Sequence, residues 1–400
     1  MRYFFILCFV SFSFCQEVLS LNPQKVYELA LKNNKEIQRL RHQIKALEID
    51  HQIAKKYYLP VVYFRASLVY ELDKKEPTTE TSLNVVSTLY EFQRTKSRIE
   101  LSKIRKDITD IMLQQLYKDI QHRIIKLFVD AHLYKKLTEV KREEMAIAYV
   151  RFDRARERKE LGLTTLHEVL KLESVYREKR SELLQAQHLY NQALLEIKQL
   201  AGIPYETIVE LEDLVFNNPE GLRADFSKLK EEAMKENASL KIKQAEIRSY
   251  EKEIESARQI LSPKVNLRIS TDKSALEIST PIFDAGRPYR IEYLSSLKRS
   301  VQAEKENLEK NLELLFYSAP YEWEYLKGKY VEAVAKNKYA EENLMLRRSE
   351  YELELAFDLG YAMAEKSESE RHLMEAKYKL LLFWVKLYSL VGREPFSLLE

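Results

Sequence analysis

Apolar residues recur every three or four positions through long stretches of this chain, which is the pattern of helices with one buried face. One such stretch runs from Gln24 to Tyr58, with apolar residues at Val26, Leu29, Ala30, Ile37, Leu40, Ile44 and Leu47. Three more helices of similar size are predicted at Thr165–Leu200, Ser227–Leu261 and Tyr361–Leu390.

Two predicted helices are far longer, Arg94–Leu161 and Pro288–Leu359. At about 1.5 Å per residue, the first would measure roughly 100 Å. No globular core needs a helix of that length, so the pattern predicts a rod or a tube. Pro320 lies near the middle of the second long helix, where its missing N–H predicts a kink.

Two pairs of shorter segments alternate apolar and polar residues, which is the pattern of half-buried β-strands. The predicted strands are Val61–Leu72 with Ser82–Tyr90, and Lys264–Thr271 with Ala275–Phe283. We therefore predict one β-hairpin within residues 61–90 and another within residues 264–283. Their lengths are at or slightly below the about 9–11 residues that a tilted strand needs to cross a bilayer.

The same order of segments occurs twice along the chain. Ala30-Leu-Lys-Asn-Asn34 matches Ala233-Met-Lys-Glu-Asn237, and Val62-Tyr-Phe-Arg-Ala-Ser67 matches Val265-Asn-Leu-Arg-Ile-Ser270. Leu161-Gly162 likewise matches Leu359-Gly360. An ordered series of matches indicates a tandem duplication. We predict a signal peptide at residues 1–15, a first repeat at 16–204, a linker at 205–223 and a second repeat at 224–400.

Composition narrows the range of functions. The chain has 400 residues, of which only 7 are glycine and 10 are proline, too few for the many loops of an ordinary α/β enzyme or a β-sandwich. Charged residues make up 32%, yet the net charge is only +3, which argues against a dedicated nucleic-acid binder. The fold class is therefore mainly α with a small β part.

The N-terminus reads as a secretory signal peptide. Arg2 is followed by a short apolar run to Phe14, and Ser13 and Cys15 suit a cleavage site before Gln16. Lipidation at Cys15 is the alternative, although the bulky Phe14 before it disfavours that cut. Cys8 and Cys15 are the only cysteines, so the processed chain would have no disulfide.

Aromatic residues cluster near the ends of the predicted strands, as they do at the membrane interfaces of outer-membrane barrels. These residues are Tyr57, Tyr58, Tyr63, Tyr70, Tyr90, Phe92, Phe283 and Tyr289. The simpler interpretation is two small hairpins packed on a helical bundle. Four strands on one exported chain would leave open edges, however, and three copies would supply twelve strands for a closed barrel.

Several segments resemble the TolC-like outer membrane efflux proteins. The strand exits Leu89-Tyr-Glu-Phe-Gln-Arg94 and Pro281-Ile-Phe-Asp-Ala-Gly-Arg287 carry the resemblance, together with the duplicated plan. Residues 151–170, which include Leu161-Gly-Leu-Thr-Thr-Leu-His-Glu168, resemble the helix-tip signature of that family. The resemblance extends from about Leu21 to Pro395.

The resemblance implies an outer-membrane channel of a tripartite efflux or type I secretion system, reaching into the periplasm and performing no chemistry. It implies a homotrimer whose chains share a 12-stranded barrel and a periplasmic α-barrel. The implied partners are outer-membrane lipid, a periplasmic adaptor (membrane fusion) protein and an inner-membrane pump of the RND, ABC or MFS type.

The resemblance also implies helix-tip turns at Gly162 and Gly360, and a periplasmic aperture closed by side chains just beyond them. The aperture candidates are Glu168, Glu365, Lys366, Glu368 and Ser369. Lys366 stands where the family has an acidic residue, so two modes of closure stay open, an acidic ring or Lys/Glu pairs.

Motifs for catalysis, cofactors and metals are absent from the sequence. It contains no nucleophile elbow, zinc-protease motif, phosphate-binding loop or dinucleotide fingerprint, and its seven histidines are scattered. We therefore expect that the protein is not an enzyme and that it has no cofactor, no metal site and no nucleic-acid partner. A soluble periplasmic coiled-coil scaffold or adaptor is the alternative function, and fractionation with the outer membrane would distinguish the two.

Overall fold

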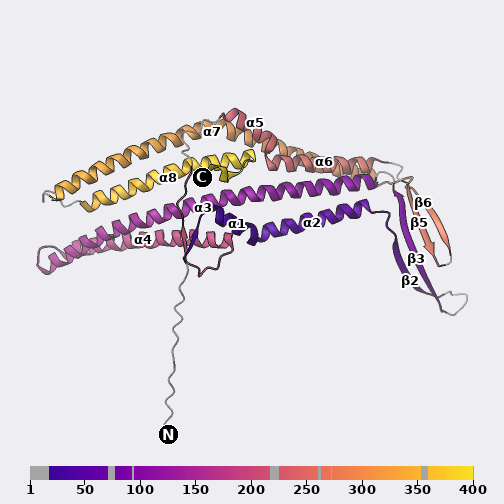
Figure 1. Ribbon diagram of the computed structural model, residues 1–400, viewed down its shortest axis with the longest axis horizontal. Helices are drawn as coiled ribbons and strands as arrows, with labels where there is room; N and C mark the ends of the chain where they lie inside the picture. The colour runs from indigo at the N-terminus through magenta and orange to yellow at the C-terminus, as the bar shows by residue number, and fades with distance from the viewer. Residues whose placement is uncertain are drawn as a thin grey trace, which may run out of the picture.

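The computed structural model describes residues 18–70, 77–91, 94–216, 225–259, 263–271, 273–352 and 359–399. The described helices lie along the long axis of an elongated molecule, and a four-stranded sheet projects from one end (Figure 1). This arrangement confirms the predicted fold class, long helices with a small β part. The predicted signal peptide, Cys15 and Phe92 lie outside the described residues, as does part of the predicted linker.

Each half contains the same series of elements. In the first half they are α1 (Pro23–Asn33), α2 (Lys35–Lys55), β2 (Val61–Tyr70), β3 (Pro77–Glu91), α3 (Arg94–Glu160) and α4 (Leu166–Ala201). In the second half they are α5 (Phe226–Glu236), α6 (Ala238–Arg258), β5 (Lys264–Ser270), β6 (Ser274–Ser279), α7 (Arg287–Glu352) and α8 (Leu359–Val391). A 3₁₀-helix at Pro395–Leu398 follows α8.

The first helix of each half is divided in two, where the apolar pattern predicted one continuous helix. Asn34 separates α1 from α2, and its side chain accepts hydrogen bonds from the N–H groups of Glu36 and Ile37. Asn237 separates α5 from α6 in the same way and accepts from the N–H of Leu240. An asparagine that caps a new helix favours extended backbone at its own position, so it interrupts the helix without disturbing the apolar spacing.

The two long helices have nearly the predicted lengths, with 67 residues in α3 and 66 in α7. Pro320 lies inside α7 and does not interrupt it. Figure 1 shows α7 bowed near its middle rather than straight. A bend is the expected consequence of a proline that removes one hydrogen bond from the helix.

The helix α3 lies at the centre of the chain (Figure 1). It packs against α2 and α4 of its own half and against α6 and α8 of the other half, whereas α7 packs against α5, α6 and α8. Ile124 and Phe128 of α3 belong to one apolar cluster, and Ile125 and Val129 to the other. The two halves therefore share a core through this helix.

Matching glycines end α4 and α8. Gly202 has a φ of +69° and Gly392 a φ of +80°, a left-handed conformation that glycine adopts without steric cost. In both turns the next residue donates a backbone hydrogen bond back into the helix, Ile203 to Lys198 and Arg393 to Tyr388. These turns are equivalent features of the two repeats.

Two sheets are present in the described chain. Leu19–Leu21 (β1) pairs in parallel with Val209–Leu211 (β4), a pairing that was not predicted from the sequence. The larger sheet is antiparallel, with the strand order β2-β3-β5-β6. The strand β6 ends at Ser279, four residues earlier than predicted, and Pro281 next to it cannot donate a backbone hydrogen bond to a sheet.

Candidate functional site

The larger sheet has one mostly apolar face and one mostly polar face. Paired residues of an antiparallel sheet point to the same face. The register therefore places one set of apolar side chains together, namely Val62, Phe64, Leu83, Val85, Leu267, Ile269, Leu276 and Ile278. The other face carries most of the polar side chains, including Arg65, Asn84, Thr88, Asn266, Arg268 and Glu277.

The apolar face is uncovered in the single chain. Phe64 is 73% exposed, Leu68 is 72% exposed and Ile278 is 67% exposed. Exposed apolar side chains in one continuous patch mark a surface that meets lipid or another protein. On the polar face, Arg268 pairs with Glu277 at 3.3 Å, and the Thr88 hydroxyl donates to the Asn266 side chain at 3.1 Å.

Most of the predicted interface aromatics lie where the sheet meets the helices. Tyr57 and Tyr58 follow α2, with ring centroids 5.9 Å apart, and Tyr90 lies next to the end of β3. Phe283 lies between β6 and α7, Tyr289 lies in the first turn of α7, and both are largely exposed. Tyr63 is near the start of β2, and Tyr70 is its last residue, at the opposite end. Contact with a membrane interface remains a prediction for these residues.

The opposite end of the molecule contains the turn between α3 and α4 (Figure 1). Gly162 has a φ of +70° there, and the N–H of Leu163 donates to the carbonyl of Arg158 at 2.8 Å. A Cβ added to Gly162 would meet nothing within 4 Å, so the turn needs glycine for its backbone conformation alone.

Gly360 differs from Gly162 in conformation. It is the second residue of α8, and an added Cβ would lie 3.3 Å from a side-chain carbon of Ile147 in α3. Gly360 therefore permits close packing between α8 and α3. The predicted equivalence of these two glycines does not extend to the backbone.

Glu168 has a local structural role at the start of α4. The hydroxyl of Thr165, the N-cap residue, accepts a hydrogen bond from the N–H of Glu168 at 3.3 Å. A carboxylate in the first turn also interacts favourably with the positive end of the helix dipole. Lys171 lies 3.9 Å from the Glu168 carboxylate.

The other four aperture candidates lie on α8, and three of them, Glu365, Lys366 and Ser369, contact side chains of α7. Glu365 accepts a hydrogen bond from Asn343 of α7 at 2.7 Å. The Lys366 ammonium lies 3.5 Å from Glu341 of α7 and 3.6 Å from Glu370. Ser369 is buried, and its hydroxyl lies 3.1 Å from the Asn337 side chain of α7 and 2.7 Å from the Lys366 carbonyl.

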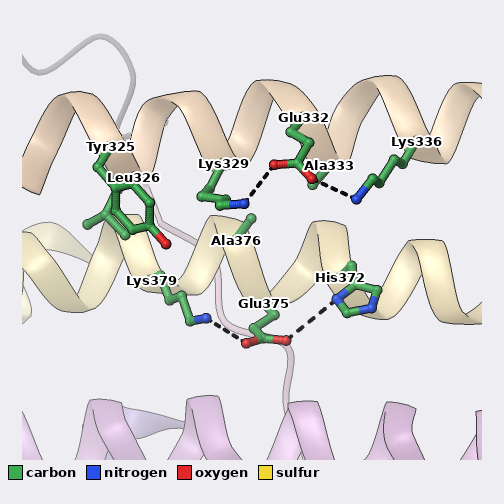
Figure 2. A pocket seen from close by; sticks show the side chains of 10 residues that line it. All are labelled: Tyr325, Leu326, Lys329, Glu332, Ala333, Lys336, His372, Glu375, Ala376 and Lys379. Atoms are coloured by element: carbon green, nitrogen blue, oxygen red, sulfur yellow. Dashed lines mark hydrogen bonds and ion pairs between the residues drawn. The ribbon is translucent and has the colours of Figure 1, made fainter.

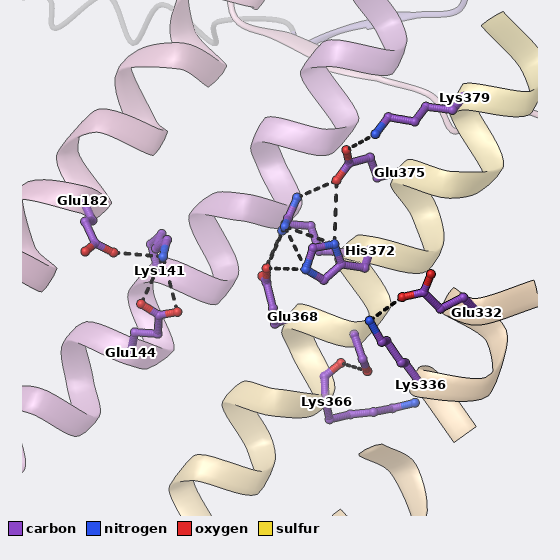
Figure 3. A network of polar contacts seen from close by, with 12 residues as sticks. Lys141, Glu144, Glu182, Glu332, Lys336, Lys366, Glu368, His372, Glu375 and Lys379 are labelled. Carbon is purple, nitrogen blue, oxygen red and sulfur yellow. Dashed lines mark hydrogen bonds and ion pairs between the residues drawn. The ribbon is translucent and has the colours of Figure 1, made fainter. Parts of the chain in front are cut away.

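Glu368 belongs to a charged group on α8 (Figure 3). It pairs with Arg371 at 2.6 Å and with His372 at 3.0 Å. Burial raises the pKa of Glu368, but the hydrogen bond and charge of Arg371 outweigh burial, so that its pKa lies below the ordinary value. Glu368 is therefore ionised and paired within the chain at neutral pH.

A charged network between α3 and α4 was not predicted from the sequence. Lys141 lies 3.1 Å from Glu144 and 2.9 Å from Glu182, and Lys179 lies 2.9 Å from Glu144 and 3.1 Å from Glu182. Lys–Glu spacing of three residues is visible in the sequence on each helix, but pairing between helices requires the fold. Lys136 adds a 2.9 Å contact from α3 to Glu370 of α8.

A groove of about 350 Å³ lies between α7 and α8 (Figure 2). Its charged side chains include Lys329, Glu332, Lys336, Glu375 and Lys379. Hydrogen bonds from Lys336 and Lys329 lower the pKa of Glu332 to about 2. Glu375 pairs with Lys379 at 2.7 Å, so both carboxylates that line the groove are paired with lysine side chains.

Two further observations concern metal ions and membrane-spanning helices in the described residues. These residues contain no group of three or more histidine, cysteine, aspartate or glutamate side chains placed to hold a metal ion. Among the helices described, none is long and apolar enough to span a membrane.

Comparison with solved structures finds the same fold in several bacterial membrane proteins. A membrane protein from Pseudomonas aeruginosa superposes with a TM-score of 0.70 and 15% identity, over 94% of this chain and 92% of the other. The outer membrane protein VceC from Vibrio cholerae gives a TM-score of 0.69 and 14% identity, over 93% and 96%. The CmeC outer membrane channel of Campylobacter jejuni gives 0.69 and 13% identity, over 92% and 85%.

Sequence comparison gives one further match. Residues 26–203 match the sequence model of a family described as outer membrane efflux protein. No curated protein sequence matches the chain significantly. The matched residues run from within α1 to just past the end of α4, and therefore include the first β-hairpin and the long helix α3.

Proposed function

We propose that this chain, which belongs to the outer membrane efflux protein family, works as a homotrimer that forms the outer-membrane channel of a tripartite efflux system. Proteins of this family are channels rather than enzymes. The channel lies in the outer membrane and extends into the periplasm, where its helices form a duct for cargo.

The amphipathic sheet carries the proposal. Its apolar face, with Phe64, Leu68 and Ile278 exposed, suits contact with lipid, and its polar face suits a water-filled lumen. The sheet stands at the end of a helix of 67 residues, about 100 Å at about 1.5 Å per residue. A hairpin that only recognised a soluble partner would not need an apolar face this exposed.

The end of the helices that lies opposite the sheet is then the periplasmic end. We assign docking of the periplasmic adaptor and the inner-membrane pump to this end, which contains the Gly162 turn. The charged groups of α8 support a constriction closed by Lys/Glu pairs, because Lys366 already contacts Glu341 and Glu370.

The aperture is tested by single-channel conductance in planar bilayers. Combined Glu168→Ala and Glu365→Ala substitution is expected to raise the conductance of the closed channel. Glu173→Gln, in an exposed pair with Arg177 on α4, is the matched control and should leave it unchanged. Equal conductance in all three proteins would remove Glu168 and Glu365 from the aperture.

The function itself is tested by fractionation and reconstitution of the full-length protein. We expect it in the outer-membrane fraction, soluble only with detergent, and trimeric when purified. It should conduct ions in planar bilayers. A monomer in the soluble periplasmic fraction would instead support the scaffold alternative and refute the channel.

A further inference from the structure

The larger sheet has two unpaired edges, β2 and β6, because its strand order is β2-β3-β5-β6. A lipid bilayer cannot supply hydrogen bonds to backbone groups on such an edge. If the channel proposed above is correct, each edge must therefore pair with another copy of this chain.

The backbone hydrogen bonds show which residues point outward at each edge. The N–H of Ser270 donates to the carbonyl of Lys273 at the turn between β5 and β6. Since bonding alternates along an antiparallel pair, the backbone groups of Ser274, Leu276 and Ile278 point away from β5. They form the free edge of β6.

The same alternation applies on the other side of the sheet. The N–H of Leu83 in β3 donates to the Thr271 hydroxyl, so the backbone groups of Leu83 point toward β5. The backbone groups of its neighbours Ser82 and Asn84 therefore point toward β2. The backbone groups of their partners Arg65 and Tyr63 then point toward β3. It follows that Phe64, Ala66 and Leu68 form the free edge of β2.

The strands are also staggered. Val61, at the start of β2, lies level with Val86, Arg268 and Ala275 across the sheet. From that level β2 continues to Tyr70, while β6 continues in the same direction only to Ser274. The pair of β2 and β3 thus extends beyond β5 and β6, and the free edge of β2 along this extension is long enough for the six residues of β6.

We propose that β6 of one copy pairs antiparallel with β2 of the next copy in the register that sets Glu277 opposite Arg65. Leu276 then lies opposite Ala66, and Ile278 lies opposite Phe64, so the apolar faces of the two chains are continuous. The outward backbone groups of both strands also meet one another. Registers shifted by one residue fail both conditions, and only shifts of two residues compete.

Charge favours this register over its neighbours. Within the described chain Arg65 has no ion-pair partner, and it lies on the same face as Glu277. Glu277 is already 3.3 Å from Arg268, so it would lie between two arginines of different copies. Opposite charges on directly opposed residues stabilise a strand pair. A shift of two residues places Glu277 opposite Tyr63 or Ser67 instead.

The tilt of the strands agrees with this register. Ala275 would lie level with Val61 of its own chain and Ser67 of the next, a climb of six residues per chain. Over three chains and twelve strands, at about 3.3 Å per residue and about 4.7 Å between strands, this is a tilt of roughly 45°. The shift that sets Glu277 opposite Ser67 requires roughly 55°, beyond the about 35–45° of outer-membrane barrels.

Four positions provide a matched test by disulfide formation between copies. In the proposed register Arg65 with Glu277, and Ser67 with Ala275, are opposed pairs whose Cα atoms are about 4.5 Å apart, within disulfide reach. The combinations Arg65 with Ala275 and Ser67 with Glu277 use the same four positions and match the two shifted registers. Single-cysteine variants report any linkage through Cys8 or Cys15.

We expect the Ser67→Cys/Ala275→Cys and Arg65→Cys/Glu277→Cys proteins to form covalent trimers in outer membranes after mild oxidation. The two mismatched variants should remain mostly uncrosslinked. Trimers that crosslink better in a mismatched variant, or in none of the four, would overturn the register while leaving the channel intact. A protein that forms no trimer and inserts in no membrane would refute the proposed function as well.

Discussion

The two long helices are equivalent in the repeat, yet they bury opposite faces. The helix α3 starts at Arg94 and α7 starts 193 positions later at Arg287, and this spacing relates the residues of one to those of the other. Ile124, Phe128 and His132 of α3 are buried, whereas their equivalents Tyr317, Tyr321 and Tyr325 are 66%, 80% and 63% exposed. Conversely, the buried residues Phe316, Ala319 and Trp323 of α7 correspond to Arg123, Lys126 and Asp130 of α3.

This difference follows from the position of each helix in the chain. The helix α3 has the other half of the molecule beside it, whereas α7 lies at an edge. In a closed ring of three chains, α7 would have the first half of the next chain beside it. The tyrosine face of α7 would then be covered as the equivalent face of α3 is covered within one chain.

The strongest test of this comparison substitutes the equivalent residues Phe128 and Tyr321. Phe128→Ala removes a fully buried ring and should lower the free energy of unfolding by about 3–5 kcal/mol, measured by thermal denaturation in detergent. Tyr321→Ala should leave the fold of each chain intact and reduce the fraction of trimers that resist dissociation by detergent. Equal loss of helical structure in the two variants would contradict the difference between the helices.

The glycines of the two helix ends give the next largest effect. An alanine at Gly202 would take a φ of +69° and bring its Cβ to 2.7 Å from the Cβ of Asn33, whose amide donates to the Ala201 carbonyl. The strain of about 1–2 kcal/mol and the loss of a hydrogen bond of about 1 kcal/mol should add, to about 2–3 kcal/mol in thermal denaturation.

Gly162→Ala is the control for conformation alone. It has nearly the same φ and no atom within 4 Å of the new Cβ, so it should cost only the strain, about 1–2 kcal/mol. A Gly162→Ala protein as unstable as Gly202→Ala would show that packing against Asn33 is unimportant.

The two asparagine caps, Asn34 and Asn237, are expected to contribute unequally to stability. Asn34→Ala removes a cap and should cost about 1 kcal/mol. Asn237→Ala removes the equivalent cap and also the hydrogen bond from the buried Asn237 amide to the Leu390 carbonyl, which measures 3.0 Å. It should therefore cost about 1–2 kcal/mol more than Asn34→Ala in the same denaturation experiment. Equal losses would show that this second bond contributes nothing.

The smallest expected effect concerns pH and the charged network between α3 and α4. Burial raises the pKa of Glu182, but the hydrogen bonds from Lys141 and Lys179 outweigh burial and hold it below the ordinary value. A lowered pKa in the folded chain stabilises it above the ordinary pKa of 4.5, and this stability is lost as pH falls through the lowered value.

Acidification below about pH 4.5 should consequently destabilise the Glu182→Gln protein less than the unsubstituted protein, by a few tenths of a kcal/mol. Glu173→Gln on the same helix removes a single exposed pair and is the control. Unfolding at pH 7 and at pH 3 measures the difference. An unchanged acid sensitivity of Glu182→Gln would show that the network does not act as a unit.

The sequence predicted the parts of this fold that depend on local periodicity. Helix spacing, strand alternation and the duplication were enough to locate α3, α7 and all four strands of the larger sheet. The breaks at Asn34 and Asn237 escaped prediction, because a capping asparagine does not alter the apolar spacing around it. The pairing of β1 with β4 also escaped, since each strand has only three residues.

At the candidate site, prediction succeeded where sequence order determines position. Aromatics next to strand ends in the sequence lie at the end of the sheet, as Tyr58 and Tyr90 do. Prediction was weaker for Gly360, whose equivalence to Gly162 rested on a match of only two residues, Leu161-Gly162 with Leu359-Gly360. Forty residues separate Gly162 from Gly202, and counting forty back from the equivalent Gly392 reaches Glu352, not Gly360. The contacts of Lys366 with α7 required the packed helices and had no local signal.

The exposed apolar face and two open edges of the sheet have a consequence for biogenesis. In the proposed trimer, each chain would present, until three chains meet, a template on which further strands can add without limit, which is the geometry of edge-to-edge aggregation. Assembly of the proposed trimer would therefore have to be faster than this side reaction. Newly exported chains would need either chaperones that shield the sheet in transit or closure of the ring at the moment of insertion.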